Sequence, residues 1–114
     1  MSDSDTVILI TRNGMGEAEQ ALQHKLIGTY LKLLDEHDIL PGALCFYTEG
    51  VYLAMEGSPV LETLQSLERK GVRLILCSTC LSYCNLTEKV RVGIIGGMGD
   101  ILEAQRLAGK VITL

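Results

Sequence analysis

The residues most able to do chemistry are three cysteines within one short stretch, Cys77, Cys80 and Cys84. Cys77 follows Leu74–Leu76, an apolar run typical of a buried strand, and Cys80 falls where the first turn of the next helix is expected. Backbone N–H groups at the start of a helix stabilise a thiolate, the form that takes up or passes on sulfane sulfur or is oxidised. The spacing therefore predicts Cys77 and Cys80 as catalytic residues.

Other roles for the cysteines remain open. Cys77 and Cys84 can instead be buried and inert, and we expect this of Cys84 more than of Cys77. Cys45, in the middle of an expected strand, is most simply a small buried residue. A thioredoxin-like dithiol and a zinc site are weaker interpretations. The first needs a suitably placed proline and the second a pair of separate Cys-x-x-Cys knuckles, so we predict no metal and no cofactor.

Residues around the cysteines form the expected wall of the site. Ser78 and Thr79 lie between Cys77 and Cys80, and glycine turns occur at 14–16 and 96–99. We predict Gly14, Gly16, Ser78, Thr79 and Gly97 as binding residues that surround the sulfur. The glycines can also serve turn geometry alone. A small-nucleotide site is the weakest interpretation, because Gly14 and Gly16 lack the third glycine of the dinucleotide pattern.

Strand and helix patterns alternate along the chain. Strands are expected at 6–11, 43–48, 72–77, within 88–95 and at 111–114. Helices are expected at 17–36, after Ser58-Pro59, from the cysteines to about 86, and after an N-capping Asp100. This order predicts an α/β fold of three layers, α/β/α, with a mainly parallel five-stranded sheet. Ligand chemistry in such folds occurs at the carboxyl ends of the strands, where the cysteines and both glycine turns fall.

Two apolar patterns predict how these elements pack. The helix at 17–36 is expected to bury one row of side chains, and the connection Val51–Met55 is unusually apolar for a loop. We expect that connection to contact a partner or to cover a site. The expected buried row of the long helix comprises Ala18, Leu22, Leu26, Tyr30 and Leu33, widened by Ala21 and Leu34.

Composition limits the class of protein. The 114 residues suit a single domain at 6–114 after a disordered N-terminus at 1–5, and the hydrophobic content is 47%. The net charge is −4, and no basic cluster is available to neutralise phosphates, so we expect no nucleic-acid partner. We also expect no membrane association, since no apolar run approaches the length of a membrane span. With no recognisable targeting segment, we predict a cytoplasmic location.

The stretch Leu74–Leu81 also resembles a known family. It is similar to the Cys-Gly-Thr-Cys-Leu segment of DsrE-family proteins, especially the C-terminal domain of YedF-type selenium-metabolism proteins. The resemblance extends from about Thr6 to the end of the chain. Further stretches that carry it are Gly14-Met15-Gly16, Phe46–Val51, Glu56–Leu61, Gly99–Ile101 and Lys110–Leu114.

This resemblance implies a Rossmann-like domain that assembles into homo-oligomers and handles sulfur or selenium. The position that receives sulfur as a persulfide in DsrE-type relays matches Cys77, and the second cysteine of the YedF-like segment matches Cys80. Ser78 replaces the usual glycine, and Cys84 is an addition. YedF-type proteins carry a TusA-like domain in front, so we expect a sulfur donor or TusA-like carrier to be a separate partner protein.

These observations predict a small sulfur-relay protein that carries a persulfide on Cys77, with Cys80 resolving or sharing it. If the protein is an enzyme, which the residues leave open, it is sulfurtransferase-like. The alternative is a non-enzymatic, oligomeric binding or regulatory module, or a thiol redox sensor. A reactive Cys77 favours transfer or sensing, and an inert Cys77 favours the binding module.

Overall fold

The strands form one parallel sheet in the order β4-β3-β2-β1-β5. This computed structural model describes residues 3–114. The strands are β1 (Thr6–Ile10), β2 (Ala43–Phe46), β3 (Arg73–Cys77), β4 (Ile94–Gly96) and β5 (Lys110–Thr113). Each neighbouring pair is parallel. The predicted five-stranded sheet is confirmed.

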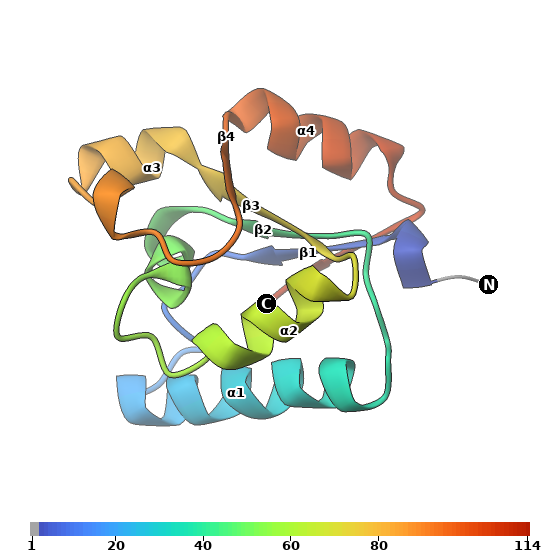
Figure 1. The fold of residues 1–114 in the computed structure, drawn as a ribbon, viewed down its shortest axis with the longest axis horizontal. Helices are drawn as coiled ribbons and strands as arrows, with labels where there is room; N and C mark the ends of the chain where they lie inside the picture. Colours follow the sequence, from blue (N-terminus) through green and yellow to red (C-terminus); the bar gives the residue numbers. More distant parts are fainter. Residues whose placement is uncertain (1–2) are drawn as a thin grey trace.

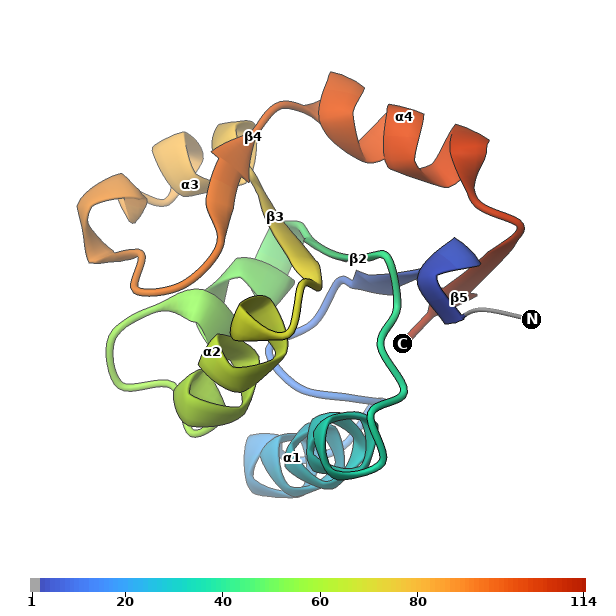
Figure 2. The ribbon, with the colours of Figure 1, turned by 45° about the vertical axis from the view of Figure 1, so that its right-hand side comes forward.

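Helices cover both faces of this sheet (Figures 1 and 2). Helices α1 (Gln20–Glu36) and α2 (Leu61–Arg69) lie on one face, and α4 (Met98–Leu107) lies on the other. The short α3 (Ser78–Tyr83) follows β3 directly. Three 3-10 segments complete the described fold: η1 (Asp3–Asp5), η2 (Thr48–Ala54) and η3 (Thr87–Lys89). The predicted three-layer α/β architecture is therefore confirmed.

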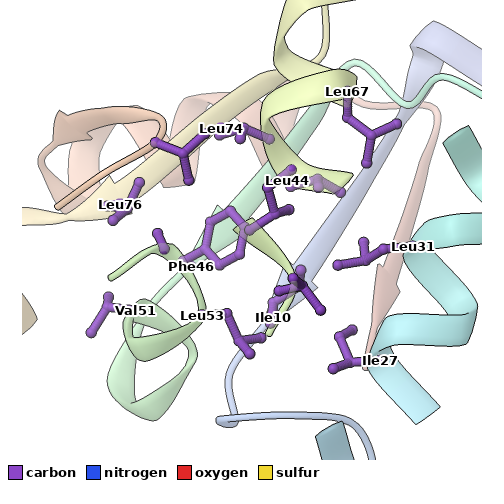
Figure 3. Close-up of a cluster of buried hydrophobic side chains, with 14 of the residues drawn as sticks. Ile10, Ile27, Leu31, Leu44, Phe46, Val51, Leu53, Leu67, Leu74 and Leu76 are labelled. Atoms are coloured by element: carbon purple, nitrogen blue, oxygen red, sulfur yellow. The ribbon is translucent and has the colours of Figure 1, made fainter. Parts of the chain in front are cut away.

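The larger hydrophobic core lies between the sheet and the α1–α2 layer. Phe46 of β2 is fully buried there, among leucine and isoleucine side chains from the strands and both helices (Figure 3). The three central strands are buried on both faces, which explains their nearly continuous apolar sequences. They form a stable platform whose carboxyl edge carries the cysteines.

A smaller core lies on the α4 face and contains two cysteines. Because side chains alternate along a strand, Leu74 and Leu76 belong to the larger core while Ile75 and Cys77 belong to the smaller one. Cys45 of β2 packs in the same smaller cluster. Cys77 therefore lies on the α4 side of the sheet.

The buried face of α1 differs from the prediction. Leu22, Leu26 and Leu33 are exposed by 48%, 44% and 47%. The buried residues of α1 are Ile27, Leu31 and Leu34, of which only Leu34 was expected. The helix carries two apolar rows at helical spacing. The sequence pattern alone did not indicate which row meets the sheet and α2.

The apolar connection after β2 is also different from the prediction. Val51, Leu53 and Ala54 are completely buried in the chain's own core, as part of η2. They need neither a partner nor a ligand to cover them. Within Val51–Met55, Tyr52 is the residue whose side chain reaches solvent.

Both later helices begin at positions other than those predicted. Helix α2 begins at Leu61, and Ser58 accepts a hydrogen bond from the Val60 N–H before the helix starts. Asp100 is not the N-cap of α4. It is the third residue of that helix, and its carboxylate accepts the N–H of Gly97, the residue at the N-cap.

The beginning of the chain is ordered where the structure describes it. Asp3–Asp5 forms η1, and the Asp5 carbonyl accepts a hydrogen bond from the Gly109 N–H at 2.9 Å. The predicted disorder at 1–5 is therefore wrong for these three residues. Residues 1–2 lie outside the described part of the chain.

Candidate functional site: a row of thiols at the carboxyl edge

Cys77 is the last residue of β3 and the residue immediately before α3. It pairs with Gly96 of β4, and only 1% of its surface is exposed. Cys80, the third residue of α3, is half-buried and contacts both hydrophobic cores. The structure thus brings the two predicted catalytic cysteines together and makes Cys80 the more accessible one.

The surroundings of Cys77 favour its thiolate. Burial raises the pKa of its thiol, but the N–H and thiol of Cys80, with the N–H and hydroxyl of Thr79, more than offset this. The net effect is a pKa below the ordinary value of a cysteine. The Cys77 side chain makes no conventional capping hydrogen bond, so these donors act as a polar environment at the start of α3.

Cys80 shows the opposite shift. Burial raises its pKa, the N–H of Thr48 opposes this, and the neighbouring sulfurs of Cys77 and Cys84 raise it further. The Thr48 N–H donates to the Cys80 sulfur over 3.1 Å. The pair is therefore asymmetric: the pKa of Cys77 is lowered and that of Cys80 is raised, so Cys77 is the better thiolate and Cys80 the thiol beside it.

Thr48 holds this donor in an unusual conformation. Its φ is +49°, a left-handed value that is uncommon for a β-branched residue. The Thr48 hydroxyl lies 2.6 Å from the carbonyl oxygen of Thr11 and 2.7 Å from that of Tyr47. At Gly50 a side chain would overlap the carbonyl of Ile10. These contacts fix η2 against β1 and aim the Thr48 N–H at Cys80.

Cys84 is exposed, so the prediction that it is a buried packing residue is wrong. It follows the last turn of α3, and its N–H donates to the Cys80 carbonyl at 3.1 Å. Its thiol lies near the hydroxyl of Tyr52 in η2, and this proximity raises the pKa of that tyrosine. Three thiols therefore lie at the start, within and at the end of one short helix, and become more exposed from Cys77 to Cys84.

Cys45 takes no part in this row. Its side chain is fully buried in β2, and burial raises the pKa of its thiol to about 11. The expectation that Cys45 is a small buried residue is correct. All four cysteines are free thiols.

The predicted binding residues divide into two groups. Ser78 and Thr79 form the first turn of α3 next to the cysteines. Gly97 follows the strand beside β3, but it donates its N–H to Asp100 at 2.8 Å, so that donor is not free for a sulfur ligand.

Gly14 and Gly16 belong to a different part of the molecule. Both have positive φ, and the contacts of their turn are with α1: Met15 N–H donates to the Gln23 carbonyl and Gln23 Nε2 to the Gly16 carbonyl. A side chain at Gly14 would overlap Gln23. Turn geometry and helix packing account for these two glycines.

Two residues of η2 were missed from the sequence, Thr48 and Tyr52. The Thr48 contribution comes from a backbone N–H, so its side-chain type carried no signal. Tyr52 stands in an apolar segment that suggested an interface, and only the folded position of η2 places it beside Cys84.

The site is an edge of the sheet rather than a deep cavity built for a metal or a large ligand. Among residues 3–114 no group of three or more His, Cys, Asp or Glu side chains could hold a metal ion. A hollow of about 210 Å³ lies under α4, but Gly42 and Arg73 on its wall are at the opposite, amino edge of the strands. The carboxyl edge suits a reactant as small as a sulfur atom.

The sequence of the chain also matches a known protein family. Residues 5–114 match the sequence pattern of the DsrE/DsrF-like family. The chain belongs to the DsrE/DsrF-like family. This confirms the family expected from the motif at Cys77, and the family's fold is of the type used in sulfur relay. No curated protein matches the chain significantly in sequence.

Solved structures share the fold at low sequence identity. The ychN protein from E. coli superposes with a TM-score of 0.71 and 18% identity, covering 96% of this chain and 97% of that protein. MTH1491 from Methanobacterium thermoautotrophicum, a protein of unknown function, superposes with a TM-score of 0.70 and 19% identity, with the same coverage of both chains. BT1422 from Bacteroides thetaiotaomicron, also of unknown function, superposes with a TM-score of 0.65 and 11% identity, covering 100% of this chain and 98% of that protein. These likenesses support the DsrE-like fold alone.

No helix in the described part of the chain has the length and apolarity to cross a membrane.

Proposed function

We propose that this DsrE/DsrF-like protein is a small sulfur-relay protein that carries sulfane sulfur as a persulfide on the Cys77–Cys80 pair. The observation that supports this most directly is the asymmetric pair itself. Cys77 has a lowered pKa at the carboxyl edge of the sheet, and a half-buried thiol stands beside it. A thiolate attacks the outer sulfur of a donor persulfide and the donor leaves as a thiolate, so no oxidant is consumed.

The expected partners follow from this chemistry. The donor or acceptor is a separate persulfide-bearing protein, such as a TusA-like sulfur carrier, and the YedF-like motif extends the proposal to selenium in place of sulfur. A persulfide carrier needs reduced thiols, which favours the cytoplasm as its compartment. The activity is that of a sulfurtransferase in the broad sense, one that moves sulfur between thiols.

The proposal is tested by incubating the reduced protein with glutathione persulfide. After trapping with iodoacetamide, we expect mass spectrometry to find an added mass of about 32 Da, one sulfur atom, within residues 74–89. Cys77→Ser should leave the added sulfur on the remaining thiols of the peptide, and Cys45→Ser should leave the adduct unchanged. If neither Cys77 nor Cys80 gains sulfur in the wild-type protein, the proposed function is wrong.

A thiol redox sensor is the second candidate, favoured by the contact between the Cys77 and Cys80 side chains. Neighbouring thiols in a Cys-x-x-Cys arrangement can close to a disulfide when an oxidant accepts their two electrons. A sensor would lose about 2 Da on mild peroxide treatment, the mass of two hydrogens. It would gain no stable sulfur from the persulfide donor, so the two treatments distinguish the candidates.

We also propose that the protein is a homo-oligomer. Apolar side chains are exposed on β4 and the adjoining α4, among them Ile94, Met98 and Leu102 at 57%, 51% and 60%. β4 is also an edge strand with an unpaired side. A second copy of the chain covering this surface would remove these side chains from water.

A further inference from the structure

Cys84 has no role in the pair described above, yet the structure places it in line with Cys77 and Cys80. Cys80 and Cys84 are four residues apart on α3 and its C-cap, so their side chains lie on the same side of the helix. Cys77 immediately precedes that helix. The three thiols differ mainly in access: Cys77 is 1% exposed, Cys80 is half-buried and Cys84 is exposed.

This gradient creates a difficulty for direct loading of Cys77. A persulfide donor must bring its outer sulfur to the attacking thiolate in line with the bond that breaks. The buried Cys77 offers no room for a peptide or protein donor, and Cys80 is flanked by Thr48 over 3.1 Å. Cys84 is the thiol of the row that such a donor can reach.

We propose that Cys84 is the outer thiol of the relay, which accepts sulfur from a bulky persulfide donor and passes it inward to Cys80 and then Cys77. The inference rests on the proposed sulfur-relay function and assigns its order of transfer. Tyr52 of η2 lies near Cys84, and the same segment also supplies the Thr48 N–H to Cys80.

Each step balances without an oxidant or a reductant. The Cys84 thiolate attacks the outer sulfur of the donor, a new sulfur–sulfur bond forms, and the donor leaves as a thiolate. Cys80 then attacks the outer sulfur of the Cys84 persulfide, and Cys84 leaves as a thiolate. Cys77 attacks the outer sulfur of the Cys80 persulfide in the same way, and Cys80 leaves as a thiolate. Each attacking thiol gives up one proton and each departing thiolate takes one up. The reverse order delivers sulfur to an acceptor.

The experiment follows the added sulfur over time with glutathione persulfide as the donor. Samples are quenched with iodoacetamide, and fragmentation of the peptide spanning residues 74–89 locates the sulfur. In the wild-type protein, sulfur should appear first on Cys84 and later on Cys80 and Cys77. In Cys84→Ser, loading of the two inner thiols should slow by about tenfold or more, since the intramolecular transfer is lost.

A matched variant tests whether the position of the outer thiol matters. Ser82 is an exposed residue of α3, and two residues from Cys80 it faces away from that side of the helix. Ser82→Cys combined with Cys84→Ser keeps one exposed thiol on the helix at a nearly equal size. The relocated thiol should gain sulfur from the donor but leave Cys77 and Cys80 as slow to load as in Cys84→Ser.

A second variant blocks the middle of the row. In Cys80→Ser, sulfur should accumulate on Cys84 and fail to reach Cys77. Circular dichroism should show that every variant is folded, as expected for substitutions at exposed or half-buried positions.

The outcomes separate the inference from the function. Loading of Cys77 and Cys80 at the wild-type rate in Cys84→Ser, or full rescue by the relocated thiol, would overturn the role of Cys84 and leave the sulfur-relay function standing. Absence of sulfur from all three thiols of the wild-type protein would overturn both.

Discussion

Cys77 and Cys80 are three residues apart, yet their pKa values shift in opposite directions. The difference arises from position. Cys77 precedes α3 and faces the N–H groups of its first turn, whereas Cys80 sits inside that turn, close to two other sulfurs. The junction between β3 and α3 therefore favours Cys77 as the thiolate and Cys80 as the protonated thiol.

Thr79→Ala tests this environment. The substitution removes a hydroxyl that favours the Cys77 thiolate and keeps the backbone N–H, so the pKa of Cys77 should rise. At a fixed pH between the pKa of Cys77 in the wild-type protein and its pKa in Thr79→Ala, a smaller fraction of Cys77 would be thiolate in the variant. Persulfide transfer by the variant would therefore be slower. The measurement is the ultraviolet absorbance of thiolate against pH, with Cys77→Ser used to assign the Cys77 contribution.

Ser82→Ala is the control, because Ser82 is exposed in the next turn and is not among the groups that shift the pKa of Cys77. An unchanged titration in Thr79→Ala would show that the Thr79 hydroxyl does not stabilise the thiolate of Cys77.

At the scale of elements, the site depends on η2 as much as on α3. η2 supplies the Thr48 N–H to Cys80 and the Tyr52 hydroxyl to Cys84, and its apolar residues anchor it in the core. The α1–α2 layer closes that core from the other side, and a polar cluster joins the two helices. Asp35 accepts a hydrogen bond from Ser66 at 2.8 Å and lies 3.1 Å from Lys70.

Asp35→Asn should therefore lower stability at neutral pH, by about 1 kcal/mol for a weakened hydrogen bond with Ser66. Burial raises the pKa of Asp35. The hydrogen bonds from Ser66 and Lys70 and the charges of Lys70 and Arg69 lower it by more, so the net pKa is below the ordinary value of 3.8. A carboxyl group whose pKa is lower in the folded state than in the unfolded state stabilises the fold at pH values above its unfolded-state pKa. This stabilisation is lost as the pH falls through the folded-state pKa. The difference in free energy of unfolding between the wild-type protein and Asp35→Asn should therefore become smaller as the pH falls below about 4.

Urea unfolding at several pH values measures this difference. Asp38→Asn is the control, because Asp38 contacts the same Lys70 at 2.8 Å but its side chain is 71% exposed, so a smaller effect is expected. A gap between wild type and Asp35→Asn that stays constant on acidification would contradict the assignment.

At the scale of the whole molecule, the two sheet faces are unequally covered. Helices α1 and α2 cover one face and α4 lies on the other (Figure 2). Apolar side chains of β4 and α4 remain exposed beside the edge of the sheet. This surface adjoins the carboxyl edge, since Gly96 of β4 pairs with Cys77. Self-association there would bring a second copy close to the thiols.

Leu102→Lys on α4 should weaken self-association, raising the dissociation constant by about tenfold if this leucine is buried at the centre of the interface. Light scattering coupled to size-exclusion chromatography, over a range of concentrations, measures the change. Leu26→Lys on α1 is the matched control, an exposed leucine on the other side of the molecule. An oligomer disrupted by Leu26→Lys and not by Leu102→Lys would place the interface on α1 instead.

The sequence by itself determined the order of elements, the parallel sheet and the placement of Cys77 and Cys80 at its carboxyl edge. These depend on local signals: continuous apolar runs, turn residues and the distance between cysteines along the chain. The motif around Cys77 also indicated the family, because it is a contiguous stretch.

Only the tertiary structure decided which surfaces are buried. The rotation of α1, the burial of Val51 and Leu53, and the exposure of Cys84 depend on packing between segments distant in sequence. The Thr48 N–H reaches Cys80 across 32 positions of the chain, through a left-handed backbone that its residue type does not favour. Chain order placed the thiols in a row, and three-dimensional packing set their access to solvent and the stabilisation of their thiolates.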